Sequence, residues 1–235
     1  MKYTDAHCHI TNCPHTNIMC CICDATNESD WDKVIEFSNS ENTFACIGVH
    51  PWFLDDIKPD WESRLYEKLV QNPTIMIGEI GLDKHKPNLE HQIQIFVTQM
   101  EIAVKLNRPV HLHCVGAWDK ILHILKAQKG KLPPVILAHG FNDDPQILGQ
   151  IAEKYNMYFS YNLHDITEKN TNIIRSTPPS RILTESDASD PTTQIQHICA
   201  SVENISKILN FSQDETINQI YDNFQRMISY VRPIE

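Results

Sequence analysis

The residues that suggest chemistry in this chain begin with two histidines near the amino terminus. His7 and His9 stand two positions apart at the end of an apolar run, and alternate side chains of a β-strand point to the same face of a sheet. If that run is a strand, both imidazoles face one point, which is an economical way to hold a divalent metal ion. Further residues of ligand type end later strand-like runs, namely Glu79, His113, His139 and Asp187.

This mixture of imidazoles and carboxylates indicates the kind of ion. It suits zinc, manganese, nickel or iron better than calcium or magnesium alone. Six candidate ligands exceed the four that one tetrahedral ion needs, so we expect two divalent ions about 3.5–4 Å apart. Glu79 is the natural bridge between them, because its strand lies between those of His7 and His113 in the chain.

Each of these residues also has a purely structural interpretation. Two histidines can share a surface strand by chance, and Glu79 can form a buried salt bridge with a lysine or an arginine. His111 lies two positions before His113 and faces the same way, either as a deeper core histidine, which we favour, or as an extra ligand or proton relay. Asp83 either orients a metal ligand through its carboxylate or is simply a residue of a turn.

Two aromatic residues after the third predicted strand also have both a functional and a structural interpretation. Trp52 and Phe53 follow His50, and they either stack on a nucleobase or pack over the site. His85, His91 and His123 are expected in solvent.

The elements that must position these side chains alternate along the chain. Strands are predicted near 2–8, 17–25, 43–49, 74–81, 109–114, 135–139, 157–161 and 181–186. Helical periodicity or capping predicts helices at 88–106, 117–127, 194–209 and from 212 onward, whereas residues 9–17 read as a loop. Alternating strands and helices favour an α/β fold, a (β/α)8 TIM-like barrel in a single domain over residues 1–235. Functional residues of such a barrel gather at the carboxyl ends of its strands.

Composition narrows the class of protein. The 235 residues carry a formal net charge of −10, which disfavours broad duplex binding through a basic face. The eight cysteines read as buried, reduced thiols. No stretch is apolar enough to span a membrane and no leader is evident, so we expect a cytoplasmic protein.

Six segments together resemble a known family. In order they read DAHCHI, GVHPWF, IGEIGLD, PVHLHC, AHGF and TESDA. The set resembles the TatD-type metal-dependent deoxyribonucleases, which are amidohydrolase-like (β/α)8 barrels, and the likeness runs from residue 5 to about 228. IGEIGLD, the segment around Glu79, is the motif most specific to the family. The shared order of all six segments is stronger evidence for the resemblance than any single segment.

The resemblance implies a role for each matching position. It makes His7, His9, His113 and His139 metal ligands and makes Glu79 the carboxylate that bridges two ions. Asp187 matches the ligand that also orients the attacking water, and Glu185 matches a conserved acid, so both are taken as catalytic. His50 matches a pocket residue that contacts substrate. The cofactors implied are two divalent ions, with zinc, manganese, nickel and magnesium all open.

Two departures from the family pattern affect the expected substrate. Val115 stands where the family usually has an arginine, and valine cannot grip a phosphate as a guanidinium does. Ser189 stands where a proline usually follows. Lys84, His85 and Lys86 either replace the lost charge or form a solvated loop.

The expected function is therefore hydrolysis by a metal-activated water. Phosphodiester bonds of nucleic acid are the first expected substrate, with single-stranded DNA ahead of a small phosphoester. The alternatives are hydrolysis of a small-molecule ester or amide or of an aminoacyl ester on tRNA, and a metal-binding paralogue that has lost catalysis. A carbamylated lysine bridge is disfavoured, because the fourth strand carries Glu79 and no lysine. A monomer or weak oligomer with no membrane partner is expected.

Overall fold

The strands of the protein form one parallel sheet that curls into a nearly closed barrel. The computed structural model describes residues 2–11, 14–40, 42–128 and 130–231. The eight strands follow chain order around the sheet: β1 (Tyr3–Cys8), β2 (Ile18–Asp24), β3 (Thr43–Ile47), β4 (Met76–Asp83), β5 (Val110–Val115), β6 (Ile136–His139), β7 (Met157–Tyr161) and β8 (Ile182–Thr184). This order confirms the predicted (β/α)8 architecture.

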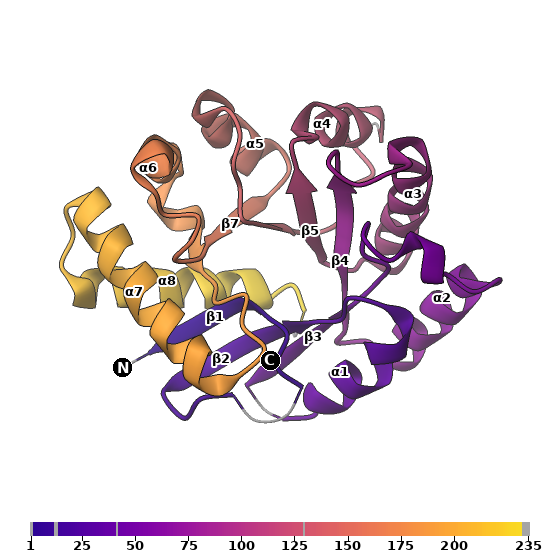
Figure 1. Ribbon diagram of the computed structural model, residues 1–235, viewed down its shortest axis with the longest axis horizontal. Helices are drawn as coiled ribbons and strands as arrows, with labels where there is room; N and C mark the ends of the chain where they lie inside the picture. Colours follow the sequence, from indigo (N-terminus) through magenta and orange to yellow (C-terminus); the bar gives the residue numbers. More distant parts are fainter. Residues whose placement is uncertain (1, 12–13, 41, 129, 232–235) are drawn as a thin grey trace.

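Helices surround the sheet on its outer side (Figure 1). They are α1 (Trp31–Phe37), α2 (Trp61–Gln71), α3 (Leu89–Leu106), α4 (Trp118–Ala127), α5 (Leu148–Lys154), α6 (Thr171–Ser176), α7 (Pro191–Leu209) and α8 (Gln213–Ile228), with short 3-10 turns at Glu28–Asp30, Leu54–Asp56, Pro145–Ile147, Glu168–Asn170 and Pro179–Arg181. The predicted capping box at the start of α8 is confirmed, because Ser212 and Glu215 satisfy each other's backbone N–H groups. Among the described residues, no helix has the length and apolar character needed to cross a membrane.

The first and last strands meet where the sheet closes. The Thr184 hydroxyl donates to the Thr4 carbonyl at 3.1 Å. Beyond the end of β8, the Asp187 N–H donates to the His7 carbonyl at 3.0 Å, and the His9 N–H donates to the Ala188 carbonyl at 2.8 Å. These bonds tie the segment after β8 to the end of β1, so His7, His9 and Asp187 are held together by backbone contacts.

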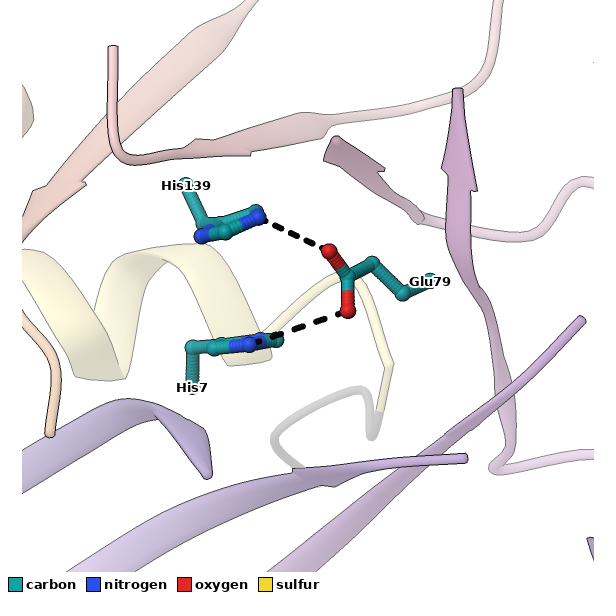
Figure 2. A group of neighbouring side chains, drawn as sticks. All are labelled: His7, Glu79 and His139. Atoms are coloured by element: carbon teal, nitrogen blue, oxygen red, sulfur yellow. Dashed lines mark ion pairs between the residues drawn. The ribbon is translucent and has the colours of Figure 1, made fainter. Parts of the chain in front are cut away.

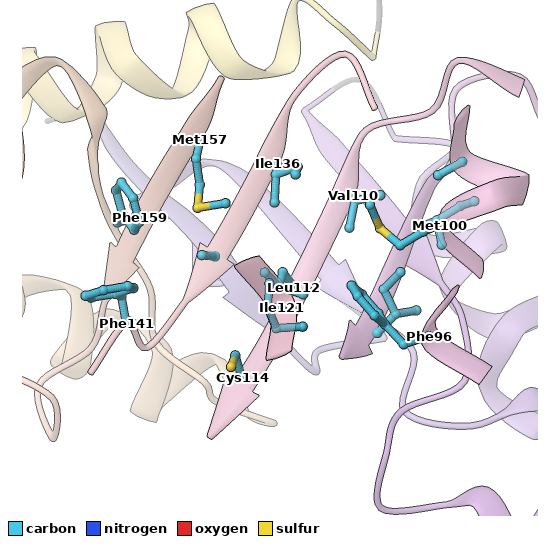
Figure 3. Close-up of a cluster of buried hydrophobic side chains, with 14 of the residues drawn as sticks. Phe96, Met100, Val110, Leu112, Cys114, Ile121, Ile136, Phe141, Met157 and Phe159 are labelled. Atoms are coloured by element: carbon cyan, nitrogen blue, oxygen red, sulfur yellow. The ribbon is translucent and has the colours of Figure 1, made fainter. Parts of the chain in front are cut away.

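Two layers of buried apolar side chains stabilise the barrel. The outer layer packs the strands against the helices, and Figure 3 shows part of it, where Phe96 and Met100 of α3 and Ile121 of α4 face Val110 and Leu112 of β5. The inner layer fills the amino-terminal end of the barrel, which α8 closes with three side chains, Phe224, Met227 and Ile228. Burial of both layers from water is the main force that closes such a sheet.

On β2, β6 and β8 the inward side chains change from apolar to polar toward the carboxyl end of the strand. Because alternate residues of a strand share a face, Cys20 and Ile22 of the inner layer are followed by Asp24, while Leu137 is followed by His139 and Leu183 by Glu185. The amino-terminal end of the barrel is therefore apolar, and the carboxyl end gathers imidazoles and carboxylates.

Other predictions from the sequence can be placed on the fold. The free cysteines among the described residues are buried, apart from the half-buried Cys199. The predicted loop at 9–17 contains no helix in its described part, and residues 12–13 lie outside the described residues.

Candidate metal centre

Glu79 lies at the centre of the polar cluster, on β4, and it is 3% exposed. Its Oε1 is 2.8 Å from both His113 Nδ1 and His139 Nε2, and its Oε2 is 3.7 Å from His7 Nε2. Figure 2 shows the two carboxylate oxygens directed at different imidazoles, His139 and His7. Burial alone would raise the pKa of Glu79, but the surrounding imidazoles outweigh burial and hold the pKa well below its usual range.

A first group of donor atoms lies on the Oε2 side of Glu79. Asp187 Oδ1 is 3.5 Å from His7 Nε2 and 3.3 Å from His9 Nε2. The backbone of Asp187 has a φ of 51°, a left-handed conformation just past the end of β8. Burial would raise the pKa of Asp187, but hydrogen bonds from the two imidazoles lower it below the usual range. Its side chain is 49% exposed, so it is the member of this group most open to solvent.

A second group lies on the Oε1 side. His113 Nδ1 and His139 Nε2 are 3.0 Å apart, and both are 2.8 Å from the same carboxylate oxygen. Burial disfavours the charged ring of His139, but the Glu79 carboxylate outweighs burial and raises its pKa to about 10. Burial lowers the pKa of His113, which keeps that ring neutral.

Two buried carboxylates support these imidazoles from behind. Asp24 Oδ2 is 3.0 Å from His7 Nδ1, and the Asp24 carbonyl oxygen is 3.0 Å from His9 Nδ1. Glu185 Oε1 is 3.5 Å from His139 Nδ1, and Glu185 also accepts hydrogen bonds from Ser160 and Asn162. Burial would raise the pKa of Asp24, but the charges of His111 and His7 outweigh burial and lower it.

The donor set fits divalent cations. Each of His7 and His9 has an oxygen acceptor at Nδ1, which places a proton there and leaves Nε2 directed toward Asp187 as the atom that could bind a metal. In the metal-free protein a proton on Nε2 links each ring to the Asp187 carboxylate, and a divalent cation between the same atoms would replace that proton. Ligand atoms about 2.0–2.2 Å from a common ion lie about 2.8–3.6 Å from one another, and the donor atoms of both groups have nearly this spacing. The salt bridge considered for Glu79 is not seen, because its ion-pair partners among the described residues are histidines.

Comparison with known proteins identifies the family. The model of the TatD related DNase family matches residues 4–229. The chain belongs to this family. A human relative named deoxyribonuclease TATDN3 is 23% identical over 97% of this chain and 95% of that protein. An uncharacterized metal-dependent hydrolase of Methanocaldococcus jannaschii is 23% identical over 95% of each chain.

Solved structures of TatD proteins have the same fold. The TatD homologue YjjV of Escherichia coli superposes with a TM-score of 0.84 at 21% identity, over 99% of this chain and 98% of that chain. A TatD-family hydrolase of Entamoeba histolytica gives a TM-score of 0.80 at 17% identity, over 97% and 98% of the two chains. These two structures support the fold, and the family match over residues 4–229 makes this chain a hydrolase of the TatD family.

His50 and Trp52 form one rim of the site in this TatD-family protein. His50 is 4% exposed, its Nδ1 accepts from the Trp52 backbone N–H at 3.1 Å, and its Nε2 is 3.3 Å from Glu79 Oε1. A neutral His50 therefore carries its proton on Nε2, where it donates rather than coordinates. Trp52 is 51% exposed, and its indole N–H donates to Asp83 at 2.7 Å. Asp83 thus anchors this rim and also caps its own turn by accepting from the His85 backbone N–H.

Two lysines, Lys84 and Lys86, follow Asp83 on this side of the site. The Lys86 ammonium is 4.1 Å from the centre of the Trp52 ring, and Lys84 is exposed beside Gly116. Phe53 is half-buried, with its ring 5.9 Å from that of His50, so it packs at the rim. The solvent placement predicted for three other histidines is confirmed, since each is exposed: His85, His91 and His123.

Asp24 is the residue that reasoning from the sequence missed. It is the last residue of β2, so the same rule that selected the other strand-end ligands would have found it. His111 is fully buried, as favoured for a deeper core histidine, but it also lies 2.8 Å from Asp24 through its Nδ1.

Proposed function

We propose that this TatD-family protein hydrolyses phosphodiester bonds of nucleic acid, with single-stranded DNA as the first substrate class, at a site that holds two divalent ions. One observation carries the proposal: the two oxygens of Glu79 face separate groups of imidazole nitrogens. A buried carboxylate so placed suits a bridge between two cations. The ions are drawn from zinc, manganese, nickel and magnesium, and the hydrolase domain is taken as residues 1–235.

The proposed ligands form two sets that share this bridge. His7, His9 and Asp187 serve one ion, and His113 and His139 serve the other. Bound divalent ions supply Lewis-acid chemistry and bring the pKa of a water at the site toward neutrality. Donors of both nitrogen and oxygen type match this assignment.

Asp187 and Glu185 have different proposed roles. The Asp187 carboxylate is half-exposed, so it can orient a water and take its proton. Glu185 is fully buried behind His139, with hydrogen bonds from Ser160 and Asn162 to its oxygens. Glu185 therefore acts on the ring of His139, which it orients, rather than on substrate.

Substrate is proposed to enter along the rim. The exposed ring of Trp52 lies 5.3 Å from the His50 ring and 6.0 Å from the His113 ring, measured between centroids. An aromatic ring with the Lys86 ammonium 4.1 Å from its centre, and with Lys84 beside Gly116, suits a base and its phosphate. His50, whose Nε2 lies 3.3 Å from Glu79 Oε1, is proposed to contact substrate at the inner end of this path.

A second candidate function rests on Val115. Its side chain is 37% exposed at the end of β5, and it presents an apolar surface where a phosphate grip is expected. That surface favours a small ester or amide, or an aminoacyl ester on tRNA. A monomer or weak oligomer remains the proposed state, and the buried thiols suit a reducing, cytoplasmic setting.

An activity panel on metal-reconstituted protein tests these proposals. Single-stranded and duplex oligonucleotides, an aryl phosphodiester and an aryl carboxylic ester are assayed side by side, with Asp187→Asn as the matched control for contaminating hydrolases. Turnover of single-stranded DNA and the aryl phosphodiester supports the first proposal. Turnover of the carboxylic ester alone supports the second, and no turnover of any substrate points to a paralogue without catalysis.

A further inference from the structure

Asp24 lies directly behind the two histidines of the first proposed ligand set. It ends β2 and is 2% exposed. Its carboxylate meets His7 Nδ1 at 3.0 Å, and its backbone carbonyl oxygen meets His9 Nδ1 at 3.0 Å. Asp24 thus provides the hydrogen-bond acceptor for Nδ1 of both rings, and the Nε2 atom of each ring faces the candidate metal centre.

His111 holds the other oxygen of the same carboxylate. Its Nδ1 is 2.8 Å from Asp24 Oδ1, although the angle is not that of a directed hydrogen bond, and it is 3.7 Å from the Cys46 sulfur. His111 is fully buried on β5, and its Nε2 has no hydrogen-bond partner among the described residues. A carboxylate in such surroundings needs compensation, and two imidazoles provide it.

A third metal ion is the competing explanation, because His7, Asp24 and His111 bring three possible ligand atoms within 4.8 Å of one another. An ion there would bind His7 through Nδ1, while Nε2 of the same ring faces Glu79 and Asp187. Metal on both nitrogens requires an imidazole stripped of both protons. A hydrogen-bonded support needs no such species.

We infer that Asp24, held by His111, is a positioning residue that fixes the tautomer and ring orientation of His7 and His9 for metal binding. The carboxylate also makes the front nitrogen of His7 a stronger donor, because it draws the Nδ1 proton toward itself. The inference rests on the proposed metal-binding function of these two histidines. The supporting pair consists of Asp24 from β2 and His111 from β5, 87 positions apart in the numbering.

The test measures metal affinity rather than activity. Zn²⁺ is titrated against a chromophoric chelator into wild type, Asp24→Asn, His111→Leu and His111→Asn. Asp24→Asn is expected to weaken binding by about 10- to 100-fold, the usual effect of losing such a support. His111→Leu is expected to weaken binding in the same direction. His111→Asn restores it, because its amide can place an N–H close to the position of Nδ1.

Leu65→Ala is the control for loss of stability alone. Leu65 is fully buried in α2, so this change lowers the melting temperature and should leave Zn²⁺ affinity unchanged. Asp24→Asn with wild-type affinity would overturn the inference. Wild type that binds no Zn²⁺ would instead refute the proposed function, so the two failures are distinguishable.

A spectroscopic measurement on wild type keeps the inference testable if the Asp24 variant does not fold. Long-range ¹H–¹⁵N correlation of the Zn²⁺-loaded protein reports which ring nitrogen carries the proton. Both His7 and His9 are expected to be protonated at Nδ1. A proton on Nε2 of either ring contradicts the proposed support.

Discussion

Val115 and its surroundings give the sharpest prediction about substrate. The side chain is 37% exposed, two residues beyond His113, so an arginine has room there. A guanidinium matches two phosphate oxygens, and a charge-assisted contact contributes about 1.5–3 kcal/mol. Because each 1.36 kcal/mol is a factor of ten, Val115→Arg should raise kcat/KM for a phosphodiester by about 10- to 150-fold. Hydrolysis of a neutral carboxylic ester should change little.

Lys84 is the native residue that could supply part of the missing positive charge to a phosphate. A Cβ built on Gly116 would lie 2.4 Å from Lys84 Cε and 2.9 Å from its Nζ, so the lysine side chain crosses the backbone next to Val115. The Lys84 N–H also donates to the Val115 carbonyl at 3.0 Å. Lys84→Ala should therefore lower phosphodiester kcat/KM by about 10-fold or more, the loss expected for one charge-assisted contact.

The assay compares an aryl phosphodiester, a single-stranded oligonucleotide and an aryl carboxylic ester for each variant. Lys207→Ala is the matched control, since Lys207 is an exposed lysine in the last turn of α7, where it pairs with Glu203. Two results would refute the reasoning. One is a Val115→Arg protein with equal losses on all substrates, and the other is a Lys84→Ala protein with unchanged phosphodiester kcat/KM.

Three further predictions concern the metal centre. Asp187→Asn should lower kcat by about 10⁴-fold or more with an unchanged far-UV spectrum, and wild-type turnover in that protein would rule out the assigned role. Glu79→Gln should reduce bound metal, measured by elemental analysis, from two ions to at most one, so retention of two ions at wild-type affinity would contradict the bridge. In metal-free protein the pKa of His139 is about 10 against 6.5 in the unfolded chain. Its contribution to stability is complete below about pH 6.5 and is lost as pH rises toward about 10. The melting temperature of metal-free protein should therefore fall between pH 7 and 10, and a flat or rising profile would count against this picture.

The strands were predictable from the sequence because buried parallel strands read as continuous apolar runs. The fourth predicted strand, 74–81, is β4 at Met76–Asp83, and the eighth, 181–186, is β8 at Ile182–Thr184. The eighth strand ends early because the N–H groups of Ser186 and Asp187 both donate to the His7 carbonyl of β1, and Asp187 takes a left-handed backbone. Such a turn depends on a partner strand that local patterns do not contain.

Short helices and supporting residues were harder to predict. Helices α1 and α5 have seven residues each and α6 has six, fewer than two full turns of periodicity. Asp24 ends a strand as the proposed ligands do, but nothing near it in the sequence shows that it supports two histidines. Its significance depends on His7 and His111, which reach it only after the barrel has formed.

The position of α8 has a consequence for how the chain is made. The three α8 side chains that close the inner layer lie between residues 224 and 228, whereas the layer begins at Ala6. During synthesis the inner apolar layer therefore stays uncovered at its amino-terminal end until residues 224 to 228 have been made and have packed against it. Exposed apolar surface makes such intermediates prone to aggregation, so we expect a chain truncated within α8 to aggregate.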